Sequence, residues 1–185
     1  MNLGQLLLVV GAMALLATLS LSINSSILRA SVVTYDSEAT VEAISIGQAM
    51  VDEILTQDYD SLVVFQFVKD PALFTPTARL GRDADSEKTS YSGGVPAIDT
   101  LPYKSQLKFN DIDDYNNYTR IVTSPYLGKF TVNDTVYYVL ESDKTTKSNA
   151  QTWYKKILVS VTHPNLLYPV VLRELVVYRK YIPPS

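Results

Sequence analysis

The residues best suited to chemistry lie in one acidic turn, where Asp111, Asp113 and Asp114 fall within four positions. Carboxylate oxygens are the hard ligands that Ca²⁺ prefers, so this turn is a candidate calcium site. The full calcium-loop pattern is missing, because no glycine follows at the required position and no glutamate closes the ring. The alternative is a turn whose aspartates cap backbone amides while Phe109 and Tyr115 anchor it to a sheet.

The sequence carries no catalytic pattern. His163 is the only histidine, and it stands before Pro164 with no candidate nucleophile or orienting carboxylate identifiable beside it. No serine lies in a G-x-S-x-G context, and no phosphate-binding glycine loop occurs. We therefore expect a protein that is not an enzyme and that uses no cofactor other than the calcium considered above.

Length and composition limit the classes of protein that remain. The chain has 185 residues, enough for one ordinary domain plus an extra segment. Its net charge is -3, from sixteen basic and nineteen acidic side chains, so no general positive field attracts nucleic acid. There are no cysteines, which excludes disulfides and thiolate metal sites. The thirteen tyrosines indicate partly solvated packing surfaces, where the ring is buried and the hydroxyl reaches water or a partner.

The element that must position everything else is the opening segment. The first 28 residues carry no charged side chain. From Leu3 to Ile23 a helix would be about 31 Å long, which matches the hydrocarbon core of a bilayer. A cleavable secretion signal is the alternative, but no Lys or Arg precedes Arg29 and the apolar core is too long for one. We expect a membrane-spanning helix over residues 3–28.

The pattern after the span indicates that the helix continues. Between Asn24 and Gln57 there is no proline, and Gly47 is the only glycine. Apolar side chains recur three or four residues apart, with acidic residues between them, as on an amphipathic helix. We expect one helix from Leu3 to Leu55, about 80 Å long, with an amphipathic half at 29–57. A span followed by a separate linker helix is the alternative.

The remainder, 58–185, is expected to form a globular head. Residues 58–68 are a short apolar run that is either a first strand or the end of the packing layer, and 69–103 read as a long surface loop because prolines and glycines are frequent there. Three β-rich runs begin at Phe130, Trp153 and Pro169.

The three runs predict an antiparallel meander over about 130–182, and the first could itself turn at Asn133 and Asp134. In the second run Ile157, Val159 and Val161 alternate with more polar positions, as in a half-buried strand. An apolar sheet face and an apolar helix stripe each require burial, so we expect an α+β fold in which the long helix packs on the sheet.

This arrangement resembles the type IV pilin and type II secretion pseudopilin superfamily. The segment Asn2-Leu3-Gly4 before the apolar run from Gln5 is similar to a prepilin peptidase junction, which makes 1–4 a short leader. Residues 109–116, FNDIDDYN, are similar to a stretch in minor pilins of the mannose-sensitive haemagglutinin pilus kind. The resemblance implies cleavage after Gly4 and methylation of the new amino terminus at Gln5.

The resemblance also implies a structural role in a filament, with other pilin-like or pseudopilin subunits, prepilin peptidase and the membrane as partners. It implies a bacterial inner-membrane protein whose head lies in the periplasm or on an extracellular filament. Val9 stands where major pilins carry a glutamate, which favours a minor or tip subunit, or an uncut anchored protein, over a major pilin. Small residues on the span would allow close helix packing, namely Gly11, Ala12, Ala14 and Ala17. The alternative is a single-pass anchored binding domain that contacts its partner through loop 69–103.

Overall fold

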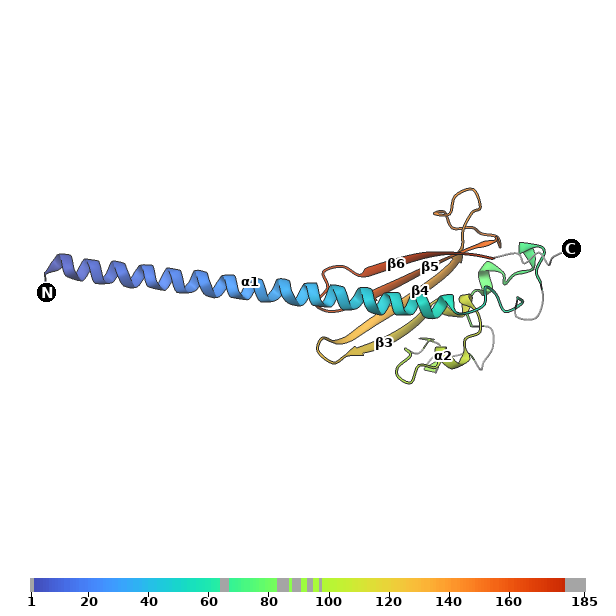
Figure 1. The fold of residues 1–185 in the computed structure, drawn as a ribbon, viewed down its shortest axis with the longest axis horizontal. Coiled ribbons are helices and arrows are strands. Elements are labelled where there is room, and N and C mark those ends of the chain that lie inside the picture. Colours follow the sequence, from blue (N-terminus) through green and yellow to red (C-terminus); the bar gives the residue numbers. More distant parts are fainter. Residues whose placement is uncertain are drawn as a thin grey trace.

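The computed structural model describes residues 2–63, 67–82, 87, 91–92, 95–96 and 98–178. Along them the chain forms one long helix, α1 (Leu3–Leu55), and a four-stranded antiparallel sheet of β3 (Tyr118–Ser124), β4 (Gly128–Tyr138), β5 (Tyr154–Thr162) and β6 (Val170–Val177). Figure 1 shows α1 extending far beyond the head, with the sheet beside its second half. The α+β fold with a long N-terminal helix is confirmed.

Short elements connect the helix to the sheet. They are two 3-10 turns (Pro71–Leu73 and Thr77–Arg79), a two-residue hairpin of β1 (Tyr91–Ser92) and β2 (Val95–Pro96), the one-turn helix α2 (Ser105–Lys108) and a third 3-10 turn (Ile112–Tyr115). The predicted loop 69–103 contains the first four of these, and its positions 83–86, 88–90, 93–94 and 97 lie outside the described residues.

Helix α1 is unbroken, so the alternative of a separate linker helix is wrong. Its polar interruptions do not break it, because their hydroxyls donate to carbonyls of the preceding turn, as Ser26 does to Ser22 (2.9 Å) and Ser31 to Ile27 (3.0 Å). The helix ends at Leu55, where the Thr56 hydroxyl donates to the Glu53 carbonyl at 2.7 Å.

The sheet follows the chain in the order β3-β4-β5-β6. Ile157, Val159 and Val161 are buried in alternation along β5, as predicted. The predicted turn at Asn133 and Asp134 is wrong, because β4 runs straight through both residues and pairs with β3 on one side and β5 on the other. Strand β3 was not expected from the sequence.

Two segments at the edges of the predicted head need separate mention. Residues 58–63 form a bridge, bends and a turn, so no strand begins there, and positions 64–66 lie outside the described residues. The predicted sheet limit at 182 also falls outside them, since the described part of the chain ends at residue 178.

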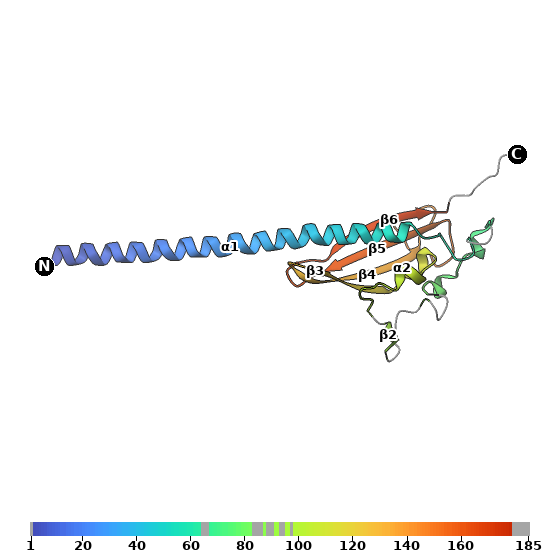
Figure 2. The ribbon, with the colours of Figure 1, turned by 60° about the horizontal axis from the view of Figure 1, so that its bottom comes forward.

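The core lies between the second half of α1 and the sheet, chiefly strands β5 and β6 (Figure 2). Every described residue of α1 before Ala39 is exposed. From there the buried positions recur three or four residues apart and include Ala39, Ala43, Gly47, Met50, Val51 and Ile54. Apolar side chains of β5 and β6 cover this stripe, with those of β5 fully buried and those of β6 partly buried. One helix therefore has a free half and a half that belongs to the head.

Gly47 sets how closely α1 approaches the sheet. A Cβ atom there would lie 2.8 Å from Leu172 Cδ1 and 3.3 Å from Val161 Cγ2. We predict that Gly47→Leu lowers the free energy of unfolding by about 1–3 kcal/mol, because extra carbon atoms would overpack this contact. Urea unfolding of the full chain in detergent micelles measures it.

The control is Gly11→Leu, since a Cβ atom at Gly11 meets nothing within 4 Å. That variant should unfold at the urea concentration of the unsubstituted chain. Equal unfolding midpoints for the Gly47 and Gly11 variants would contradict the close packing at Gly47.

Candidate functional site

The start of α1 holds the residues that the resemblance marks for processing. Gly4 lies in the first turn and is exposed, and a Cβ atom there would meet nothing within 4 Å. The backbone amide of Asn2 donates to the side-chain oxygen of Gln5 at 3.3 Å, and the backbone amide of Gln5 donates to the backbone carbonyl of Asn2 at 2.9 Å. The junction is therefore on the surface, inside the first hydrogen-bonded turn.

The small residues of the span are also exposed. At about 100° per residue, Gly11 and Ala14 lie about 60° apart around α1, as do Ala14 and Ala17, so these three residues span an arc of about 120°. Ala12 and Val9 flank this arc, about 100° from Gly11 and about 80° from Ala17 respectively. Only the pairs Gly11–Ala14 and Ala14–Ala17 are therefore neighbours on the helix surface. Helix α1 is long and apolar enough to cross a membrane by length and composition.

The acidic turn is built as a capping turn. Asp111 Oδ1 accepts from the amides of Asp113 (2.9 Å) and Asp114 (3.2 Å), and Asp114 Oδ2 accepts from the Asn110 amide (2.9 Å). Burial, with the neighbouring aspartates, raises the pKa of Asp111 to about 9, and burial raises that of Asp114 to about 7. The carboxylates thus bind the chain itself.

No group of three or more His, Cys, Asp or Glu side chains within the described part of the chain is arranged to hold a metal ion. Calcium binding by Asp111, Asp113 and Asp114 stays a prediction that a binding measurement has to test. Phe109 and Tyr115 are buried with their rings 4.9 Å apart, which places the turn against the core.

Asp113 has a partner that the sequence did not reveal. Its Oδ1 accepts from Lys155 Nζ at 2.6 Å, and Nζ also donates to the Tyr59 carbonyl at 2.6 Å and lies 3.5 Å from Asp60 Oδ2. Lys155 is fully buried. The alternation along β5 could have shown that Lys155 is buried, because Lys155 occupies the same face of the strand as Ile157. A buried lysine thus joins β5 to the acidic turn and to the segment after α1.

A second ion pair fixes the end of α1. The Arg120 guanidinium on β3 binds both carboxylate oxygens of Glu53, with Nη1 to Oε2 at 2.8 Å. The Glu53 carboxylate also accepts from the side-chain amide of Gln106 (2.9 Å) and from the Tyr115 hydroxyl (3.0 Å). Burial favours the neutral form of Glu53, but these partners outweigh it and lower its pKa.

The same guanidinium reaches the segment before the sheet. Arg120 Nη2 donates to Ser105 Oγ at 2.7 Å, and the Tyr118 hydroxyl donates to Asp99 Oδ2 at 2.8 Å. The Tyr103 ring lies over the guanidinium, with 4.1 Å from Cζ to the ring centroid. Arg120 therefore ties the last turn of α1, residues 99–106 and strand β3 together.

Asp134 stands apart from these paired groups. It lies on the buried face of β4 between Val132 and Val136, and neither of its carboxylate oxygens has a hydrogen-bond partner. Burial raises its pKa well above the usual range, and Glu53 adds to this while Arg120 opposes it. Burial without a partner therefore favours the protonated form of this carboxyl.

His163 begins a turn, as predicted, since its carbonyl accepts from the Leu166 amide at 3.0 Å. Its Nδ1 accepts from the Asn165 amide at 3.1 Å, which leaves Nε2 to donate to the Leu127 carbonyl at 2.8 Å. The ring stacks on Phe130 with centroids 4.3 Å apart. Nδ1 thus holds its own loop, and Nε2 joins this loop to the β3–β4 turn.

Comparison of the chain with family models, curated proteins and solved structures finds no match. The assignment therefore depends on the molecule itself. It shows a long N-terminal apolar helix packed on an antiparallel sheet, which is a pilin-like architecture.

The Glu53–Arg120 pair generates a stability prediction. Arg120→Met should lower the free energy of unfolding near neutral pH by about 3 kcal/mol, because it leaves the Glu53 charge partly buried without its partner. Arg120→Lys should lose less, since it keeps the charge but not the two-pronged geometry. Urea unfolding of the full chain in micelles measures both.

The pH dependence checks the cause of that loss. A lowered pKa of Glu53 stabilises the fold above the usual glutamate pKa, and this contribution disappears as the pH falls through the folded-state value. The deficit of Arg120→Met should therefore shrink in acid. A deficit that is independent of pH would show lost packing rather than a lost ion pair.

Asp134 generates the opposite pH dependence. A raised folded-state pKa means that the fold keeps a proton that the unfolded chain releases, so stability falls as the pH rises above the usual aspartate pKa. We predict that Asp134→Asn raises the free energy of unfolding near neutral pH by about 1–3 kcal/mol and has a smaller effect in acid.

The matched control for Asp134 is Asp143→Asn. Asp143 is an exposed aspartate. Hydrogen bonds from Thr145 and Thr146 lower the pKa of its carboxyl to about 2. Its replacement should give no gain in stability near neutral pH. A loss of stability in the Asp134 variant would mean that the carboxyl has a stabilising partner in the fold.

Proposed function

We propose that this protein is a non-catalytic structural subunit of a type IV pilus-like or type II secretion-like filament, in a minor or tip position. Before assembly the first half of α1 holds it in the bacterial inner membrane as a single-pass protein. Its head then lies in the periplasm, and after assembly it lies at the filament surface.

The observation that carries this proposal is the continuity of α1. The helix runs without a break from its exposed apolar half into the core of the head, where Met50, Val51 and Ile54 are buried. A rigid connection of this kind fixes the position of the head relative to the membrane or to the filament core. An anchored binding domain that acts alone has no need of it, and a flexible hinge would serve it better.

The exposed half of α1 also requires a partner. Leu7, Leu15 and Leu21 are among its side chains that remain well exposed in the isolated chain. So much contiguous apolar surface is stable only in lipid or against other apolar surfaces. In the proposed function a bilayer covers it before assembly, and the helices of neighbouring subunits cover it afterwards.

The small residues support the exchange from lipid to helix contacts. Helices approach closely in apolar surroundings where Gly and Ala line one side, because backbone atoms then come into contact. On α1 the exposed residues Gly11, Ala14 and Ala17 offer small side chains over an arc of about 120°. Val9 brings no carboxylate into the apolar core, where an unpaired one would be costly. This supports a minor or tip position, since the repeating body of a pilus uses that carboxylate for registration.

Processing tests the proposal. In a bacterium with a prepilin peptidase and a filament assembly system, the intact mass of the purified protein should correspond to a chain that begins at Gln5 with a methylated amine. Gly4→Val should stay uncut and should be absent from sheared filaments. The structure predicts that this variant folds normally, because a Cβ atom at Gly4 meets nothing.

The control is Gly11→Ala, which also adds an unhindered Cβ atom. It should be processed like the unsubstituted chain. An unsubstituted chain that retains Met1 in such a host would overturn the proposed function and would favour a permanently anchored binding domain.

A further inference from the structure

One loop of the head lies at the end that faces the apolar half of α1. Residues 163–169 connect β5 to β6, and Figure 1 shows this connection beside the middle of the helix, on the side of its N-terminus. A groove separates this loop from α1. Pro164 and Leu167 line it on the loop side, and Val32, Val33 and Asp36 line it on the helix side. The loop is thus among the parts of the head nearest to the span.

The tip of this loop is apolar and exposed. Leu167 is 81% exposed and Tyr168 is 76% exposed, and residues 163–169 contain no Asp, Glu, Lys or Arg. Exposed leucine next to exposed tyrosine is unfavourable in water, whereas both suit the boundary between lipid and water. The tip therefore has the chemistry of a membrane-interface anchor.

The loop is also held rigidly. His163 Nε2 donates to the Leu127 carbonyl of the neighbouring turn at 2.8 Å, and the Leu166 amide donates to the His163 carbonyl at 3.0 Å. Leu166 is half-buried and packs against the core. The side chains of Leu167 and Tyr168 are therefore presented by a fixed loop, and little ordering remains to be lost on binding.

The length of the span supplies a reason for the head to approach the bilayer. The charge-free part of α1, from Leu3 to Leu28, is about 39 Å long, whereas the hydrocarbon core is about 30 Å thick. A helix with such an excess tilts in the membrane, and interfacial anchors set the direction of the tilt. Because α1 is unbroken, tilting toward residues 163–169 lowers this loop toward the lipid surface.

We propose that Leu167 and Tyr168 form a second membrane contact, which inserts into the head-side lipid–water interface and holds the stored subunit in a tilted orientation. This inference rests on the membrane-embedded state of the proposed function. The partner is the bilayer interface, so the contact has to be released when the subunit leaves the membrane.

Fluorescence quenching by lipids brominated along their acyl chains tests the contact. The full chain is reconstituted into phosphatidylcholine vesicles with and without the brominated lipid. Leu16→Trp and Tyr168→Trp are each made in a chain that carries Trp153→Phe, so each has one tryptophan. The quenched fraction in the Tyr168→Trp variant should approach that in the Leu16→Trp variant, whose probe lies within the span.

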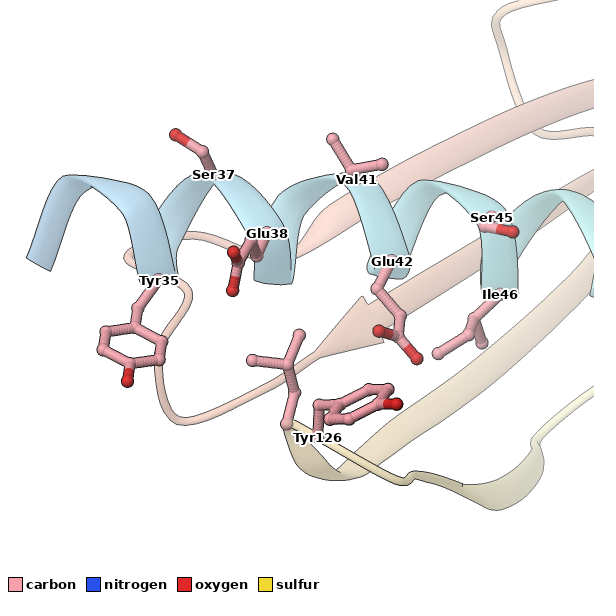
Figure 3. Close-up of a pocket in the computed structure, with 9 residues that line it drawn as sticks. Tyr35, Ser37, Glu38, Val41, Glu42, Ser45, Ile46 and Tyr126 are labelled. Atoms are coloured by element: carbon pink, nitrogen blue, oxygen red, sulfur yellow. The ribbon is translucent and has the colours of Figure 1, made fainter. Parts of the chain in front are cut away.

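Two controls show whether the effect is specific. The native Trp153 stacks on Tyr178 at the opposite end of the sheet and should not be quenched. Tyr126→Trp places a probe at a 95% exposed tyrosine on the β3–β4 turn, beside Glu38 and Glu42 of α1 and farther from the span (Figure 3). Its quenching should be clearly weaker than that of Tyr168→Trp.

The Leu16→Trp probe separates the two proposals. If it is quenched while Tyr168→Trp is quenched no more than Tyr126→Trp, the interface contact is overturned and membrane storage stands. If Leu16→Trp itself is not quenched, membrane storage fails as well. A blue-shifted Tyr168→Trp signal without quenching would show a protein surface over the loop, such as a second copy, and would also overturn the contact.

Discussion

The packing of the second half of α1 on the sheet is the constraint on which the rest of the structure depends. Gly47 allows the helix to lie close to β6, and the Glu53–Arg120 pair fixes its last turn to β3. Between these two points the apolar stripe of α1 is covered by β5 and β6. Because the helix is unbroken, this packing also fixes the direction in which its free apolar half leaves the head. Any partner of that half, whether lipid or another helix, is therefore oriented relative to the head.

Buried charged side chains hold the segment after α1 and the acidic turn against the sheet. The chain has no cysteine, so no disulfide can attach the segment after α1 or the acidic turn to the sheet. Lys155 makes that attachment from inside the core through Asp113 and the Tyr59 carbonyl. Such pairs add little net stability, since removing ions from water is costly, but they penalise every arrangement that leaves one partner alone. Asp134 is buried without such a pairing, and this burial raises the pKa of its carboxyl.

The proposed function uses one helix in three surroundings: lipid, the head and a filament core. Only the first and third exchange, because both are apolar, and small residues such as Gly11 make helix contacts competitive with lipid contacts. The head stays attached through this exchange because its share of α1 is buried separately. In the proposed membrane contact, Leu167 and Tyr168 touch the bilayer only in the stored state, so this contact would bias the orientation of the subunit before assembly.

The sequence by itself determined the elements whose signals are local. A charge-free run followed by an amphipathic stripe without proline defined α1 to within its observed ends, and alternation defined the buried face of β5, because both patterns repeat along one segment. Tertiary structure decided what depends on distant partners. Strand β3 mixes polar residues with Ile121 and Val122 and is held in place by pairing with β4. Asn133 and Asp134 look like a turn but lie mid-strand, because β3 and β5 pair on both sides of them. The partners of Glu53, Asp113 and Lys155 lie more than forty positions away in sequence. Chain folding alone brings such groups together, so no local pattern of residue types could reveal that these carboxylates bind the chain's own cations.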